Sequence, residues 1–176
     1  MKILVAEDEE DIRRVYYSTL IERGHDIILK SDGEGCLKTY CQRQLQEHQH
    51  HNKEKTSPPY FDVVILDYKM PRKDGLQVAK EILEVNPDQR IIFASAYVKE
   101  TLVEAVKELK RVVELMQKPF SMSTLVDTVE NREAYEGLKK LMITTKDIIK
   151  DFDNPSSDQI KQLFEALRRV QTYKGF

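Results

Sequence analysis

An apolar run that ends on an acid constrains this chain more than any other stretch. The residues from Asp62 to Leu66 are almost wholly apolar and β-branched, and Asp67 ends the run. Such a run is typical of a strand buried on both faces, as in a parallel sheet. Residues 70–75, MPRKDG, then predict a loop. Since α/β proteins place their sites at the carboxyl ends of parallel strands, Asp67 is the first candidate functional residue.

Along the chain, short apolar runs alternate with stretches in which apolar residues recur at helical spacing. This alternation predicts a parallel sheet with helices on both faces, because right-handed crossovers place the helices there. The expected strands are Lys2–Ala6, His25–Lys30, Asp62–Asp67, Arg90–Ala96 and Val112–Met116. The fold class is therefore α/β, with a doubly wound five-stranded sheet.

The last part of the chain is read as helical. From Ser121 the apolar pattern predicts one long helix that runs to residue 152, with Gly137 expected to kink or end it. Residues 153–157 break the pattern, and a final helix carries an apolar stripe that begins at Ile160 and includes Leu163. We expect this helix to fold back on the preceding one as a hairpin, and a further role in dimerisation or partner binding stays open.

Composition narrows the function classes. The chain has 176 residues, of which 40% are hydrophobic and 33% charged, so one domain, or one domain with an appendage, is expected. The net charge of -2 gives no argument for binding nucleic acid or an anionic membrane. No apolar run approaches the roughly 18 residues of a membrane helix, and a cytoplasmic protein is expected. The polar, His-containing residues 42–59 are read as a solvated insertion rather than a metal site.

Four of the predicted strands carry polar residues at their carboxyl ends or just after them. Since the carboxyl ends of parallel strands share one edge of the sheet, the acids Glu7, Asp8 and Asp67 should converge there, and their mutual repulsion calls for a cation. Carboxylate oxygens suit Mg2+, while a hydroxyl and an ammonium group nearby suit an anion. The pattern predicts a site that holds a phosphoryl group on a carboxylate beside a metal. Its members are Glu7, Asp8, Asp67, Ser95 and Lys118.

With these pieces in this order, the chain resembles the receiver domain of two-component response regulators. The resemblance rests on the Glu7-Asp8 pair, the signature from Asp67 to Gly75, Ser95-Ala96 and Lys118-Pro119-Phe120. It covers about residues 1–130, which predicts a receiver domain there. Residues 131–176 would be a helical extension, formed by the continuation of the last receiver helix and one further helix.

The resemblance implies roles for the matching residues. It implies a flavodoxin-like sheet with strand order 2-1-3-4-5 and a phosphorelay function, in which Asp67 accepts a phosphoryl group from a histidine kinase or phosphotransfer protein. Asp8 would be the main Mg2+ ligand, with Glu7, Asp67 and the backbone carbonyl of Lys69 completing the set. Ser95 would bond a phosphoryl oxygen, and Lys118 would pair with the phosphate and precede a cis peptide bond. Output would be by protein contact, including a homodimer through the C-terminal helices.

Two positions depart from the family pattern. The aromatic residue expected three positions before the lysine is Leu115 here, so the coupled rotation of hydroxyl and aromatic ring is not predicted in its usual form. Tyr97, two residues after Ser95, is an alternative gate for the site. The added length between Asp8 and Asp67 falls within residues 42–59.

Two alternatives come from other classes. A haloacid-dehalogenase-like, Mg-dependent phosphatase also uses an aspartate nucleophile, but it expects a second aspartate two residues later, where this chain has Lys69. A receiver-like binding module that is not phosphorylated is the second alternative, against which the full set of acids, hydroxyl and lysine argues. Residues 131–176 have interspersed charges and too little length for a DNA-recognition domain, so DNA binding and a catalytic output are not expected.

Overall fold

The predicted strands form one sheet with the order β2-β1-β3-β4-β5, so the predicted fold class is confirmed. Strand β1 pairs in parallel with β2 and β3, and β3 pairs in parallel with β4. The fifth strand starts later than expected, and residue 112 lies outside the described residues. The strands are Lys2–Ala6 (β1), Asp26–Lys30 (β2), Val63–Asp67 (β3), Ile91–Ser95 (β4) and Glu114–Gln117 (β5).

The structure is a computed structural model, and the helices follow the predicted alternation. It describes residues 1–50, 58–111, 113–131, 133–140, 149, 151 and 154–171, without the side chains of residues 48–50 and 170–171. The chain divides into two compact units, Met1–Ala94 and Ser95–Phe176. The helices are Glu10–Glu22 (α1), Gly33–His50 (α2), Gly75–Val85 (α3), Val98–Leu109 (α4), Met122–Glu130 (α5) and Ser157–Gln171 (α7), and residues 133–140 are also helical.

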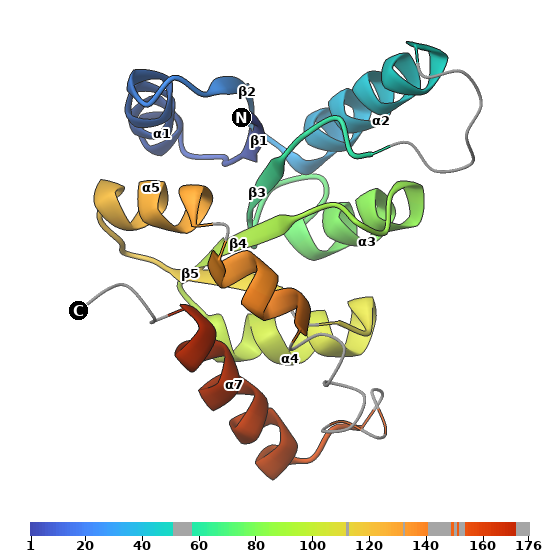
Figure 1. Ribbon diagram of the computed structural model, residues 1–176, viewed down its shortest axis with the longest axis vertical. Helices are drawn as coiled ribbons and strands as arrows, with labels where there is room; N and C mark the ends of the chain where they lie inside the picture. The colour runs from blue at the N-terminus through green and yellow to red at the C-terminus, as the bar shows by residue number, and fades with distance from the viewer. Residues whose placement is uncertain are drawn as a thin grey trace. The chain divides into compact units, whose positions relative to one another are not determined.

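In the first unit, the apolar strand β3 lies at the centre of the core. Its residues Val63, Val64, Ile65 and Leu66 have no exposed surface. Helix α1 lies on one face of this unit's strands, and α2 and α3 lie together on the other face (Figure 1). A strand covered on both faces requires apolar side chains at every position, which explains why β3 shows no alternation of polar and apolar residues.

In the second unit, α7 packs against α4 (Figure 1). Leu163 and Leu167 of α7 are buried, at 0% and 2% exposure, so the predicted apolar stripe is covered. We expected α7 to pack on the helix that directly precedes it, whereas the contact that the structure describes is with α4. Residues 141–148, which belong to that preceding segment, lie outside the described residues.

The prediction of one long helix from Ser121 is wrong. Helix α5 ends at Glu130, and Asn131 has a non-helical backbone with φ -77° and ψ 87°. The Asn131 side chain then accepts a hydrogen bond of 2.9 Å from the N–H of Ala134, as an N-cap does for the helical residues 133–140. Gly137 lies inside this second helical stretch rather than at its end. The extension is therefore not a direct continuation of α5.

Among the described side chains of the polar residues 42–59, which include the end of α2, one is buried. Gln44 is 1% exposed, and its amide donates to the carbonyl of Pro58 at 3.2 Å and accepts from the N–H of Tyr60 at 2.9 Å. This glutamine joins α2 to the chain that leads into β3. The three histidines of the segment lie outside the described side chains, so the interpretation of residues 42–59 as a solvated insertion rather than a metal site stays a prediction.

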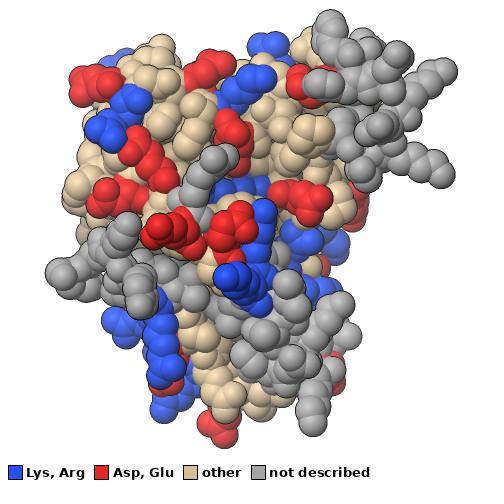
Figure 2. All heavy atoms as spheres, in the orientation of Figure 1, with Lys and Arg blue, Asp and Glu red and all other residues tan. Residues whose placement is uncertain are grey.

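Basic and acidic side chains alternate over the face seen in Figure 2. Among the described residues, no helix is long and apolar enough to cross a membrane.

Candidate functional site

The register of β1 and β3 brings three acids to one edge of the sheet. Ala6 pairs with Leu66 in this parallel ladder, so the next residues on the two strands, Glu7 and Asp67, lie side by side. Asp8 follows directly after Glu7. The predicted convergence of Glu7, Asp8 and Asp67 therefore follows from strand pairing alone.

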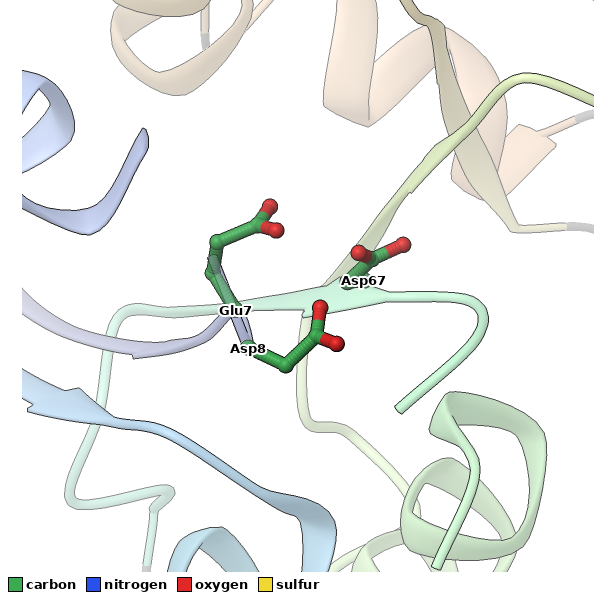
Figure 3. A group of neighbouring side chains, drawn as sticks. All are labelled: Glu7, Asp8 and Asp67. Atoms are coloured by element: carbon green, nitrogen blue, oxygen red, sulfur yellow. The ribbon is translucent and has the colours of Figure 1, made fainter. Parts of the chain in front are cut away.

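The three carboxylates form a compact cluster. Each of Glu7, Asp8 and Asp67 has one oxygen within 4.8 Å of those of the other two. Figure 3 shows their carboxylates turned toward a common space, with Glu7 and Asp8 following β1 and Asp67 ending β3. Glu7 is fully buried, Asp67 is half-buried and Asp8 is exposed, so the cluster reaches from the core to solvent. Hard oxygen donors at this spacing fit Mg2+, which keeps several waters in addition to its protein ligands.

Helix α1 adds two residues to this cluster that sequence reasoning missed. Arg13 donates from Nη1 to the carbonyl oxygens of Glu7 and Asp8, at 2.7 and 2.6 Å, and so fixes the backbone of the acid pair. Tyr16 is buried, and burial raises the pKa of its phenol; the negative charges of Glu7, Asp67 and Glu9 raise this pKa further. The phenol therefore stays neutral while it feels the charges of the acids. Both residues lie on the helix that follows the acid pair.

The loop after Asp67 is held against the strand end. The N–H of Lys69 lies 3.4 Å from Oδ1 of Asp67, and the N–H of Gly75 donates to the carbonyl of Tyr68 at 3.0 Å. A Cβ at Gly75 would lie 2.3 Å from the backbone oxygen of Asp67, so no larger residue fits there. Asp74 caps α3 by accepting from the N–H of Gln77 at 2.8 Å. Asp74 and Gly75, which end the signature of the family, thus have roles in the structure of this loop.

A strained turn stands in the middle of the same loop. Arg72 has φ 68°, and the N–H of Lys73 bonds the carbonyl of Pro71 at 2.8 Å, as in a γ-turn. Such a backbone costs about 1–3 kcal/mol at a residue other than glycine and persists where neighbouring contacts enforce it. The Arg72 guanidinium pairs with Asp32 at 3.1 Å, and a Cβ at Gly33 would lie 2.1 Å from the carbonyl oxygen of Lys73.

Asp32 also begins a helix. Its Oδ1 accepts from the N–H of Gly35 at 2.8 Å in the first turn of α2. The turn between β2 and α2 is thereby joined to the loop after Asp67, a link that sequence reasoning missed. An Asp-Gly pair such as residues 32–33 favours a turn, but it holds no information about the partner loop.

The second unit holds the predicted hydroxyl and lysine. Ser95 ends β4 and is 2% exposed, whereas Lys118 follows β5 and is half-buried. The N–H of Lys118 donates to the carbonyl of Ser95 at 2.9 Å, so the structure brings these two residues together. The peptide bond between Lys118 and Pro119 is cis, as predicted. Within this unit the two anion-binding candidates come from adjacent strands, while the three acids belong to the first unit.

The two positions that depart from the family pattern also lie in the second unit. Leu115 is a buried residue of β5, at 8% exposure. Tyr97 is 54% exposed and directly precedes α4, and its N–H donates to Oγ of Ser95 at 3.0 Å. The roles of both residues in a switch stay predictions.

The sequence also matches a family model, in agreement with this geometry. Residues 3–130 match the response regulator receiver domain, and the chain belongs to this family. It carries the receiver domain of a two-component response regulator, which is a signalling module. The predicted resemblance is confirmed.

Individual relatives agree with this assignment. The chain is 26% identical over 129 residues to the response regulator receiver protein CpdR of Brucella abortus, a match that covers 73% of this chain and 93% of that protein. It is 32% identical over 129 residues to the DNA-binding transcriptional regulator NtrC of Azospirillum brasilense, where the match covers 73% of this chain but 23% of that protein. The chain therefore spans only part of the length of some relatives.

Solved structures show the same fold. A response regulator receiver domain protein from Clostridium thermocellum superposes with a TM-score of 0.58 at 25% identity, over 80% of this chain and 98% of that one. The receiver domain of the sensor histidine kinase PA1611 from Pseudomonas aeruginosa superposes with a TM-score of 0.57 at 19% identity, over 73% and 93%. That second structure has a magnesium ion coordinated in its active site cleft.

Proposed function

We propose that Asp67 is the phosphoacceptor of this response regulator and that a histidine kinase or a phosphotransfer protein is the donor. One observation carries the proposal: the carboxylates of Glu7, Asp8 and Asp67 lie within 4.8 Å of one another where two neighbouring parallel strands end. Receiver domains as a family interact with histidine kinases or phosphotransfer proteins. Asp67, half-buried at the end of β3, combines access for a donor with a fixed position.

The proposed chemistry is a single displacement at phosphorus. A carboxylate oxygen of Asp67 forms the new bond to phosphorus, and the bond between phosphorus and the donor's imidazole nitrogen breaks. The imidazole keeps the electron pair of that bond and then takes up a proton. The product is an acyl phosphate on Asp67, which brings additional negative charge to a cluster that already holds two other acids.

Magnesium is the proposed cofactor. Asp8, Asp67 and the backbone carbonyl of Lys69 would hold the ion, with Glu7 binding directly or through water. Bound there, Mg2+ would offset the negative charge that accumulates during transfer. The oxygen donors of the cluster, and the ion in the receiver of PA1611, support this choice. The contact of Lys69 N–H with Asp67 and the close packing of Gly75 keep the loop that carries the Lys69 carbonyl beside the acids.

Ser95 and Lys118 are the proposed ligands of the phosphoryl group. Ser95 would donate its hydroxyl proton to a phosphoryl oxygen, and the Lys118 ammonium would pair with the phosphate charge. Their shared backbone hydrogen bond supports a joint role. Tyr97 remains the proposed gate, because Leu115 lacks the aromatic ring that receivers usually place in β5.

The extension, residues 131–176, is the proposed output element of a receiver domain that spans residues 1–130. Packing of α7 on α4 supports transmission through α4. It replaces the idea of a rigid helix continuing from α5, which the break at Asn131 excludes. Signalling would be by protein contact in the cytoplasm, with a homodimer through the C-terminal helices as one form of it. Neither DNA binding nor turnover of a phosphate ester is part of the proposal.

Uptake of phosphate from a small donor tests this function. The full chain is incubated with acetyl phosphate, with and without Mg2+, and intact mass is followed over time. The wild type should gain one phosphoryl group in a Mg2+-dependent reaction, and Asp67→Asn should gain none. Asp62→Asn is the matched control, because Asp62 is an exposed acid just before the same strand and bonds the N–H of Lys2 at 2.7 Å.

The outcomes separate the alternatives. Uptake by Asp67→Asn at the wild-type rate would place the phosphoryl group elsewhere and overturn the proposal. No uptake by the wild type would favour a binding module that is not phosphorylated. Steady Mg2+-dependent hydrolysis of a generic phosphate ester would favour the phosphatase, an alternative that none of the relatives above supports.

A further inference from the structure

A buried hydrogen bond joins the hydroxyl of Ser95 to helix α4. Ser95 Oγ lies 2.9 Å from Oγ1 of Thr101, and the exposed fractions of the two residues are 2% and 0%. Ser95 ends β4 and Thr101 lies in the first half of α4, so this contact connects a strand end to a helix. Water does not compete for a bond at such depth, and both hydroxyls must satisfy their hydrogen-bonding capacity among the groups around them.

Both hydroxyls also contact the backbone of Tyr97. Thr101 Oγ1 lies 2.8 Å from the Tyr97 carbonyl, which accepts the N–H of Thr101 as well, at 2.9 Å. The N–H of Tyr97 in turn donates to Ser95 Oγ at 3.0 Å. A hydroxyl has one proton and two acceptor positions. Thr101 therefore has one proton for two acceptors, Ser95 Oγ and the Tyr97 carbonyl.

This geometry allows two arrangements of the protons. In the first, Thr101 donates to the Tyr97 carbonyl and accepts the proton of Ser95, which is then engaged inside the protein. In the second, Thr101 donates to Ser95 Oγ. Both acceptor positions of Ser95 are then filled, by Thr101 and by the N–H of Tyr97, and its own proton is left to donate outward. Phosphoryl oxygens accept hydrogen bonds and do not donate them, so they select the second arrangement.

We propose that Thr101 is a positioning residue that sets Ser95 as a hydrogen-bond donor to the phosphoryl group. The inference rests on the phosphoryl-binding role proposed for Ser95 and adds a residue that no motif of the family pattern had pointed to. Phosphorylation shifts the Thr101 proton from the Tyr97 carbonyl to Ser95. The side-chain bond at the start of α4 is thereby exchanged for a bond to the strand, and α4 is the helix on which α7 packs.

The test removes the Thr101 hydroxyl and keeps the shape of the side chain. Thr101→Val should slow phosphoryl uptake from acetyl phosphate with Mg2+ by about three- to tenfold, the equivalent of one ordinary hydrogen bond. Thr101→Ser keeps the hydroxyl and should therefore take up the phosphoryl group at about the wild-type rate. Thr128→Val is the matched control, because Thr128 donates to the carbonyl four residues earlier, at 2.7 Å, from the exposed part of α5. Thermal unfolding of each variant verifies that it is folded, and Thr101→Ala replaces the valine variant if that one does not fold.

A double-mutant cycle distinguishes positioning from a structural role. Thr101→Val should add no further slowing in a Ser95→Ala background, because the hydroxyl that Thr101 orients is already absent. Equal slowing by Thr101→Val in both backgrounds, or no slowing in either, overturns the inference. If Ser95→Ala takes up phosphate as fast as the wild type, the proposed role of Ser95 and the inference fail together. Uptake by Asp67→Asn at the wild-type rate is a separate result, which overturns the phosphoacceptor assignment instead.

Discussion

Two strand ends in this molecule are held in opposite ways. The loop after β3 is fixed by a glycine pressed against the Asp67 backbone, a strained turn at Arg72 and the ion pair of Arg72 with Asp32. The segment after β4 is held by neutral hydrogen bonds among Ser95, Tyr97 and Thr101, whose protons can be exchanged. The first arrangement suits a rigid support for charge, and the second suits a part that responds when charge arrives. Substitutions at the two strand ends can test this difference.

The largest expected effect comes from the rigid end. Gly75→Ala places a Cβ 2.3 Å from the carbonyl oxygen of Asp67, and a backbone atom cannot move away as a flexible side chain can. We expect the free energy of unfolding to fall by about 3 kcal/mol. We also expect phosphoryl uptake to fall by more than about tenfold, since a small misplacement of a reacting group is costly. Urea denaturation and intact mass measure the two effects.

Gly35→Ala is the control for this substitution. Gly35 lies in α2, and its nearest neighbour to an added Cβ is a carboxylate oxygen of Asp32 at 3.4 Å, an ordinary contact. Alanine should leave stability unchanged or raise it by up to about 1 kcal/mol, because glycine is a poor helix former. Equal destabilisation by both substitutions would contradict the idea that the loop after β3 is the rigid one.

An intermediate effect is expected at Asp32, which braces the same loop. Asp32→Ala removes the cap on Gly35 and the partner of Arg72, and should cost about 1–2 kcal/mol. Asp32→Asn keeps an oxygen for the cap and loses the charge, so it should cost less than half as much. Chemical denaturation measures both, and phosphoryl uptake should be slower in both variants. Glu10→Gln, in the exposed pair with Arg14, is the control and should change stability by less than about 0.5 kcal/mol.

The sequence predicted those parts of the site that depend on repeating geometry. Parallel register makes the residues after β1 and β3 neighbours, so the convergence of Glu7, Asp8 and Asp67 could be predicted from strand order. The pairing of Asp32 with Arg72 could not be predicted, because it depends on the path of two loops. Residue Asn131 was missed because apolar spacing continues across it, although asparagine favours helix caps.

The C-terminal helix shows a similar limit. The stripe of α7 correctly predicted that one face of the helix is buried, as Leu163 shows with no exposed surface. An amphipathic pattern indicates that one face of a helix is buried, but it does not identify the element that packs on that face. The packing of α7 on α4, earlier in the chain than β5, therefore required the structure.

The smallest expected effect concerns charge, which the β3 end has and the hydroxyls at the β4 end lack. Burial raises the pKa of Tyr16, and the charges of Glu7, Asp67 and Glu9 raise it further. Burial also raises the pKa of Tyr40, with a smaller contribution from Cys41. Since both phenols have a higher pKa in the folded chain than the usual 10.0, the unfolded chain releases these protons first. Their contribution to stability is complete below about pH 10 and declines as the pH rises above it.

Substitutions can assign this alkaline loss to the acid cluster. Tyr16→Phe and Tyr40→Phe should each reduce the fall in unfolding free energy above about pH 10, which is at most about 1.4 kcal/mol per pH unit for one group. Asp67→Asn removes one of the charges that act on Tyr16. It should therefore reduce the part of the alkaline loss of stability that is due to Tyr16 and leave the part that is due to Tyr40 unchanged. Urea titrations between about pH 9 and 11 measure these slopes. Equal changes at both tyrosines would mean that burial alone sets the Tyr16 pKa and that the acids at the end of β3 do not act on it.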